Sequence, residues 1–136
     1  MNEYIKYIIV SIIILVLDGI WIYNNLGMYA SSVKKIQKAD LSVNYYHAIV
    51  AYILVLFTSI YIAIPFTRMN VKKEDGIKEK LWKSLIYGGA VGFAVYGIYN
   101  FTSLSIYKDY ELSVGLLDTL WGTSLNTFVV FIYLML

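Results

Sequence analysis

The stretch Leu17-Asp18-Gly19-Ile20-Trp21 places one carboxylate directly after an apolar run that carries no charge from Ile8 to Leu17. The same pattern returns as Leu117-Asp118-Thr119-Leu120-Trp121, inside a final run, Leu112 to Leu136, that holds no other charge. Runs of this kind are typical of helices that cross a lipid bilayer. Because a carboxylate at membrane depth costs roughly 2.5 to 3.5 kcal/mol on insertion scales, both aspartates need partners or a function.

The composition indicates that lipid is the solvent of this fold. The 136-residue chain is 60% hydrophobic and 15% charged, and its mean hydropathy is +0.66. A soluble domain is roughly 45 to 50% apolar. We therefore predict an all-α integral membrane four-helix bundle, a single membrane domain over residues 1–136 with spans at approximately 4–25, 45–66, 82–105 and 112–136.

Several classes of protein are excluded by what the chain lacks. Cysteine is absent, which removes disulfides, thiolate catalysis and cysteine-ligated metals. The net charge of +2 is too small to suggest a nucleic-acid partner, and the basic residues beside apolar ends suit lipid headgroups. No Walker loop, HExxH motif, GxGD-type protease signature or nucleophile elbow occurs. We expect membrane lipids as partners, no cofactor and no nucleic acid.

Local signals predict where the helices end and how they pack. The first run is long for a signal peptide and lacks a nearby cleavage site, so we expect an uncleaved helix that stops near Asn24–Gly27, followed by a polar loop. In the third run Ser84, Gly88 and Gly92 form a small-residue face, expected at the centre of the bundle or at a subunit contact. The short connection 106–111 predicts that the third and fourth helices are antiparallel neighbours.

The distribution of lysine and arginine predicts the orientation. With four spans, one side of the membrane collects seven of these residues and the other side collects four. Cytoplasmic loops carry the excess of basic residues, so both termini are predicted to be cytoplasmic. The richer side holds Lys6, Arg68, Lys72, Lys73, Lys78, Lys80 and Lys83, and the poorer side holds Lys34, Lys35, Lys38 and Lys108.

Polar side chains from all four runs are predicted at similar depth in the non-cytoplasmic half. Each tryptophan of the repeated pattern lies three residues after its aspartate, on the same helical face, where its ring can cover the carboxylate. Two carboxylates within about 6 Å would share a proton. A metal held by Asp18, Asp118 and His47 has no support in their spacing, and no metal site is expected. The candidate binding or proton-relay residues are Asp18, Asp118, Asn100, His47, Trp21, Trp121, Tyr99 and Thr102.

Three motifs together resemble the small four-helix membrane proteins grouped as domain of unknown function 2177 (DUF2177). They are Leu17-Asp18-x-x-Trp21, Tyr99-Asn100-Phe101-Thr102-Ser103-Leu104 and Leu117-Asp118-x-x-Trp121-Gly122-Thr123. The family pattern for the second motif is Tyr-Asp-aliphatic-Thr-Asn, from which Asn100 and Ser103 depart. The resemblance covers nearly the whole chain and implies an integral membrane fold, but it supplies no activity.

Three functions stay open at this point. The first is transport or binding of protons or a small solute at the intramembrane site, as an oligomer that would offer room for a pore. The second is a membrane enzyme that acts on a lipid or apolar small molecule with the aspartates as acid and base. The third is an assembly protein in which the acids only lock helices together. We place transport or binding ahead of an assembly role because two acids cost more than a structural lock requires. The missing catalytic motifs favour a protein that is not an enzyme, and the enzyme remains an open alternative.

Overall fold

The computed structural model describes all 136 residues and contains four long helices, each long and apolar enough to cross a membrane. The first is α1 (Glu3–Gln37), and the last is α6 (Leu112–Met135). The second combines α2 (Tyr45–Phe57), the π-helical segment η1 (Thr58–Ala63) and α3 (Ile64–Arg68). The third combines α4 (Ile77–Lys83), the π-helical segment η2 (Ser84–Gly89) and α5 (Ala90–Ile106). The predicted all-α membrane bundle is confirmed.

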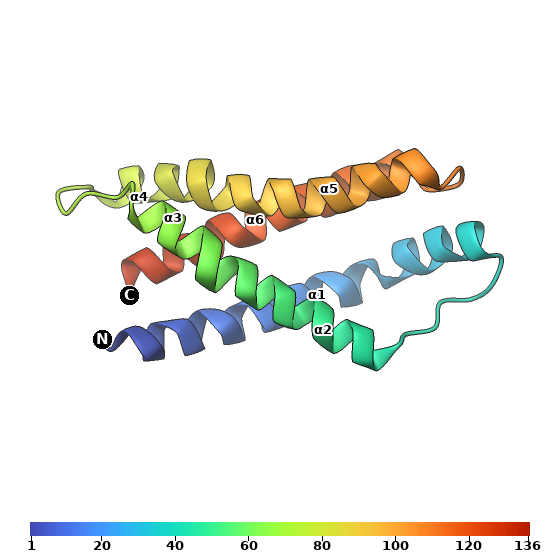
Figure 1. The fold of residues 1–136 in the computed structure, drawn as a ribbon, viewed down its shortest axis with the longest axis horizontal. Helices are drawn as coiled ribbons and strands as arrows, with labels where there is room; N and C mark the ends of the chain where they lie inside the picture. The colour runs from blue at the N-terminus through green and yellow to red at the C-terminus, as the bar shows by residue number, and fades with distance from the viewer.

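The helices alternate in direction, so the two ends of the bundle differ in what they hold. Both termini and the loop between α3 and α4 lie at one end, which we call the terminal end (Figure 1). The connections from α1 to α2 and from α5 to α6 lie at the other, which we call the distal end (Figure 1). α5 and α6 run antiparallel and pack along their length, as the short connection predicted.

The first helix is longer than predicted. The expected stop near Asn24–Gly27 is wrong, because α1 continues to Gln37 and ends only where Lys38 adopts φ 58°. The side-chain amides of Asn24 and Asn25 donate back to the carbonyls of Ile20 and Trp21, at 2.8 and 2.9 Å, and so stay within the helix. With 35 residues α1 is about 52 Å long, which exceeds a hydrocarbon core of about 30 Å. The distal end of α1 therefore projects beyond the apolar core or tilts across it.

Proline explains the wide turn in the second helix. Pro65 has no backbone N–H, and its ring clashes with the carbonyl four residues earlier in a regular helix. The π-helical segment η1 directly precedes it and relieves this clash by widening the helix. At this turn the Ser59 hydroxyl lies 3.1 Å from Oδ1 of Asn126 in α6, which gives a buried polar link between two helices.

The small-residue face of the third helix packs on α6 within the chain. A side chain at Gly88 would come 2.9 Å from Val130, and one at Gly92 would collide with the backbone carbonyl of Gly122. The two helix backbones approach closely because no side chain intervenes, as small residues at this spacing allow. Of the two places expected for this face, the structure shows packing inside the bundle.

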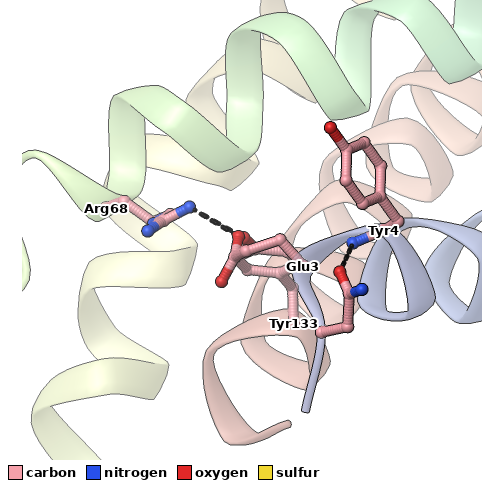
Figure 2. A network of polar contacts seen from close by, with 5 residues as sticks. Glu3, Tyr4, Arg68 and Tyr133 are labelled. Atoms are coloured by element: carbon pink, nitrogen blue, oxygen red, sulfur yellow. Dashed lines mark hydrogen bonds and ion pairs between the residues drawn. The ribbon is translucent and has the colours of Figure 1, made fainter.

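The apolar core lies in the half of the bundle next to the termini. A polar cluster closes this end: Arg68 of α3 donates to Glu3 of α1 at 2.9 Å and to the hydroxyl of Tyr133 of α6 at 2.8 Å (Figure 2). Tyr133 in turn donates to Glu3. Three helices are thus joined at the terminal end. The core consists of Val10, Ile14, Ala63, Ile64, Leu125, Val129, Val130 and Tyr133.

Candidate functional site

The two Leu-Asp-x-x-Trp stretches meet where α1 crosses α6. The indole rings of Trp21 and Trp121 stack with centroids 4.6 Å apart and planes inclined by 3°. α1 and α6 run in opposite directions, so each tryptophan lies about 4.5 Å along the helix axis from its own aspartate, toward the level of the other. The two copies of this short pattern therefore face each other across the crossing of α1 and α6, with their tryptophan rings in contact.

The hydrogen bonds follow this crossed arrangement. Trp121 Nε1 donates to Asp18 Oδ1 at 2.8 Å. Trp21 Nε1 donates to the hydroxyl of Tyr29 at 2.9 Å, and that hydroxyl donates to Asp118 Oδ1 at 2.7 Å. Because an indole can only donate, the direction along this chain is fixed. Each tryptophan therefore serves the aspartate of the opposite helix, directly or through Tyr29, whereas the sequence suggested that it covers its own.

Asn100 extends the network toward the distal loop. Its Nδ2 donates to Asp118 Oδ2 at 2.7 Å, and its Oδ1 accepts from the hydroxyl of Tyr110 at 2.5 Å. An amide can donate and accept at once, whereas a carboxylate at this position could not donate to Asp118. Both oxygens of Asp118 are thus engaged, from α1 and from α5.

Asp18 differs from Asp118 in its hydrogen bonding. It is buried at 7% exposure, and its Oδ1 accepts a hydrogen bond from Trp121 Nε1. The tyrosine hydroxyls within electrostatic reach of Asp18 come from three helices and belong to Tyr29, Tyr52 and Tyr96. None of these neighbours is basic, so Asp18 has hydrogen-bonding neighbours but no ion-pair partner.

Both aspartates line one cavity of about 680 Å³ between α1, α2, α5 and α6. This volume is in the range of sites for small organic ligands, about 300 to 1,000 Å³. The wall that α1 contributes follows a regular stripe, in which residues recur three or four positions apart: Asp18, Ile22, Leu26, Tyr29, Val33 and Ile36. α2 contributes Ala51 and Val55, and the cavity extends from the level of the aspartates to the distal loops at Leu41 and Tyr107.

The lining is mostly apolar, and its polar groups are few. Fifteen of the 20 lining residues are hydrophobic, and the lining includes no lysine, arginine or histidine. Ser32 of α1 lines the cavity at 3% exposure, and its Oγ is the one buried side-chain polar atom without a hydrogen-bond partner. Buried hydroxyls normally have a partner, so an unpaired one in a cavity wall marks a position where a ligand or water can bind.

The structure brings together most, but not all, of the predicted site residues. Six of them, Asp18, Asp118, Asn100, Trp21, Trp121 and Tyr99, belong to the network or line the cavity. His47 is exposed at the start of α2 and Thr102 is exposed on α5, and neither lines the cavity. No group of three or more His, Asp or Glu side chains could hold a metal ion. That the two carboxyl groups lie within about 6 Å stays a prediction.

The sequence analysis missed several residues of the site, among them Tyr29, Ser32 and Tyr110. Tyr29 and Ser32 fell in the loop expected after Gly27, and Tyr110 fell in the connection before α6. A signal for the first two was present, because the apolar stripe on α1 continues at helical spacing through Leu26, Tyr29 and Val33. No comparable pattern identifies Tyr110, whose role depends on how the short connection folds back over Asn100.

Comparison with known families gives one match. The model of a family described as "Predicted membrane protein (DUF2177)" matches residues 3–134, nearly the whole chain. No curated protein and no solved structure matches the sequence.

Proposed function

This multi-pass membrane protein belongs to the DUF2177 family, and we propose that it binds a small, largely apolar solute in the cavity between α1, α2, α5 and α6, as one step in transport. Asp18 and Asp118 are the polar anchors of this solute. The observation that carries the proposal is that two carboxylates line one cavity of ligand size, although they lie far apart in the sequence and are each unfavourable in the membrane.

A purely structural role accounts less well for this arrangement. Asp118 alone would suit such a role, because both of its oxygens are engaged by Tyr29 and Asn100. Helix locks of this kind need close packing, however, and here the acids border an open volume that also contains the unpaired hydroxyl of Ser32. An enzyme needs acid and base groups aimed at a common reacting atom, and no observation identifies such an atom.

The cavity extends toward the distal end, where the positive-inside rule places the non-cytoplasmic face. A solute could therefore enter from the outer leaflet or the outer aqueous phase and reach the aspartates in the membrane. The core and the polar cluster of Glu3, Arg68 and Tyr133 close the opposite end. Transport would require this end to open, and a second copy of the chain would provide further surface for a pathway.

Binding can be tested by tryptophan fluorescence, since two of the three tryptophans border the site. In a Trp82→Phe background the only remaining indoles are Trp21 and Trp121. The protein is placed in lipid nanodiscs and titrated with N-phenyl-1-naphthylamine, a neutral apolar fluorophore that accepts energy from tryptophan. We expect saturable energy transfer, lost when Ser32→Phe fills the cavity.

The matched control is Ser31→Phe, the same change one residue earlier, at an exposed position that does not line the cavity. It should retain saturable transfer, whereas non-specific partition into lipid would be equal in both variants. Equal, non-saturable signals from the two variants would overturn the proposed function.

A further inference from the structure

We infer that the solute of this cavity is a hydrophobic organic cation, that is, an apolar molecule that carries a single positive charge such as an amine or a quaternary onium group. The inference rests on the proposed function and names the ligand class for the same site. It depends on three features of the structure: the charge of the cavity, the pairing of nearby cations, and the chemistry of the wall.

The cavity wall contains two carboxyl groups and no basic side chain. Asp18 and Asp118 are its only charged lining residues. Buried charges in a membrane protein are usually paired with one another or with a ligand, because an unpaired one is strongly disfavoured. The hydrogen bonds to these carboxylates come from neutral donors, namely Trp121, Tyr29 and Asn100. A ligand of positive charge supplies the missing counter-charge.

The basic residues of α1 that lie next to the cavity wall form ion pairs with acids outside the cavity. Lys34 pairs with Asp40 at 2.8 Å, Lys38 pairs with Asp109 at 3.3 Å, and Lys35 pairs with Glu111. All three lysines are exposed at the distal end, and none lines the cavity. Their charges are thus balanced by other acids, and none of them provides a counter-charge inside the cavity.

The wall suits the body of a hydrophobic cation. Five of the lining residues are tyrosines, whose ring faces attract cations while their carbon surface accepts apolar groups. The unpaired hydroxyl of Ser32 adds an acceptor for an N–H donor. A hydrophobic anion would face the two carboxylates at close range and be rejected. The five tyrosines are Tyr29, Tyr96, Tyr99, Tyr107 and Tyr110.

Two ions of nearly equal shape and opposite charge test the inference. Tetraphenylphosphonium and tetraphenylborate are each titrated into the same nanodiscs, in the Trp82→Phe background with the neutral fluorophore bound. Binding of each ion is measured as the loss of energy transfer to N-phenyl-1-naphthylamine. Only the binding that Ser32→Phe abolishes is counted. We expect cavity binding of the cation to exceed that of the anion by on the order of tenfold or more. Asp18→Asn and Asp118→Asn should each reduce this preference. Glu74→Gln, which removes an exposed acid at the terminal end that pairs with none of these lysines, should leave the preference unchanged.

The outcomes separate this inference from the proposed function. Binding of the neutral fluorophore that Ser32→Phe abolishes, together with equal or stronger cavity binding of the anion, would overturn the cation preference and leave the solute-binding function standing. A cation preference that survives in both aspartate variants would also overturn it. If no probe of any charge binds in a way that Ser32→Phe abolishes, the proposed function itself fails.

Discussion

At the scale of single residues, Asp118 shows why a carboxylate is tolerated in an apolar helix. Its two oxygens accept hydrogen bonds from Tyr29 and Asn100, each at 2.7 Å, so little of its hydrogen-bonding capacity is lost on burial. Asn100 is oriented in turn by Tyr110 and by the carbonyl of Tyr96. The acid therefore links three segments of the chain as well as bordering the cavity.

This arrangement predicts an order of stability among substitutions at position 118. Asp118→Leu leaves the Tyr29 hydroxyl and the Asn100 amide without their acceptor and should lower the stability by about 1–3 kcal/mol. Asp118→Asn keeps one acceptor and should have a smaller effect. The measurement is the melting temperature in detergent micelles.

Asp40→Leu is the control, because an exposed ion pair contributes only about 0–1 kcal/mol. If Asp118→Leu melted at the same temperature as Asp40→Leu, the hydrogen bonds around Asp118 would not contribute to the stability of the fold.

At the scale of elements, the bundle is asymmetric in its packing. α5 and η2 make a close interface with α6, while α1 and α2 contact each other little. Glycines allow the close interface, since the ring of Tyr96 lies against Gly122 where a side chain would collide with it. The loose contact of α1 with α2 leaves space for the cavity between these helices, α5 and α6.

Two glycine substitutions should separate close packing from helix propensity. Gly92→Ala places a methyl group against the Gly122 carbonyl and the Asn126 amide, and overpacking of this kind costs about 1–3 kcal/mol. Gly19→Ala meets nothing within 4 Å and should be neutral or stabilising, by up to about 1 kcal/mol. Melting temperatures in detergent compare them.

Equal melting temperatures for these two variants would contradict the close approach of α5 and α6. A loss of stability in Gly19→Ala alone would contradict the open space that the structure shows beside Gly19.

At the scale of the whole molecule, the four helices alternate, with both termini at one end. Few of its residues are buried, 24 of 136, and large apolar side chains cover much of the outside. This surface suits a bundle surrounded by lipid, where apolar side chains can face outward without cost.

The orientation in the membrane is a separate prediction, based on the excess of basic residues at the terminal end. Because the chain has no cysteine, single cysteines can be introduced without background. In intact cells, a membrane-impermeant maleimide should label Ala39→Cys at the distal end and spare Lys73→Cys, which should become accessible after the membrane is permeabilised. Labelling of both positions in intact cells would contradict the four-span topology.

The sequence by itself determined that the chain lies in lipid, that it forms four long helices, and which acids lie within apolar runs. Runs of apolar side chains as long as a bilayer is thick leave little choice but membrane helices, since backbone groups in lipid must bond within their own segment. For the same reason Asp18 and Asp118 stood out: a carboxylate in such a run is costly wherever the chain folds. The motifs also sufficed to indicate the family, which the match over residues 3–134 shows.

Tertiary structure alone decided which residues meet. Trp121 became the partner of Asp18 because α1 and α6 cross in opposite directions. A hydrogen bond between two helices depends on their crossing angle and on which residues lie at the same height, and local sequence does not fix either for segments about a hundred residues apart. The end of α1 was decided only partly in this way. Tyr29 gains a partner on α6, whereas the side chains of Asn24 and Asn25 bond locally to carbonyls four residues earlier. The part of α1 beyond the expected stop supplies Tyr29, Ser32, Val33 and Ile36 to the cavity wall.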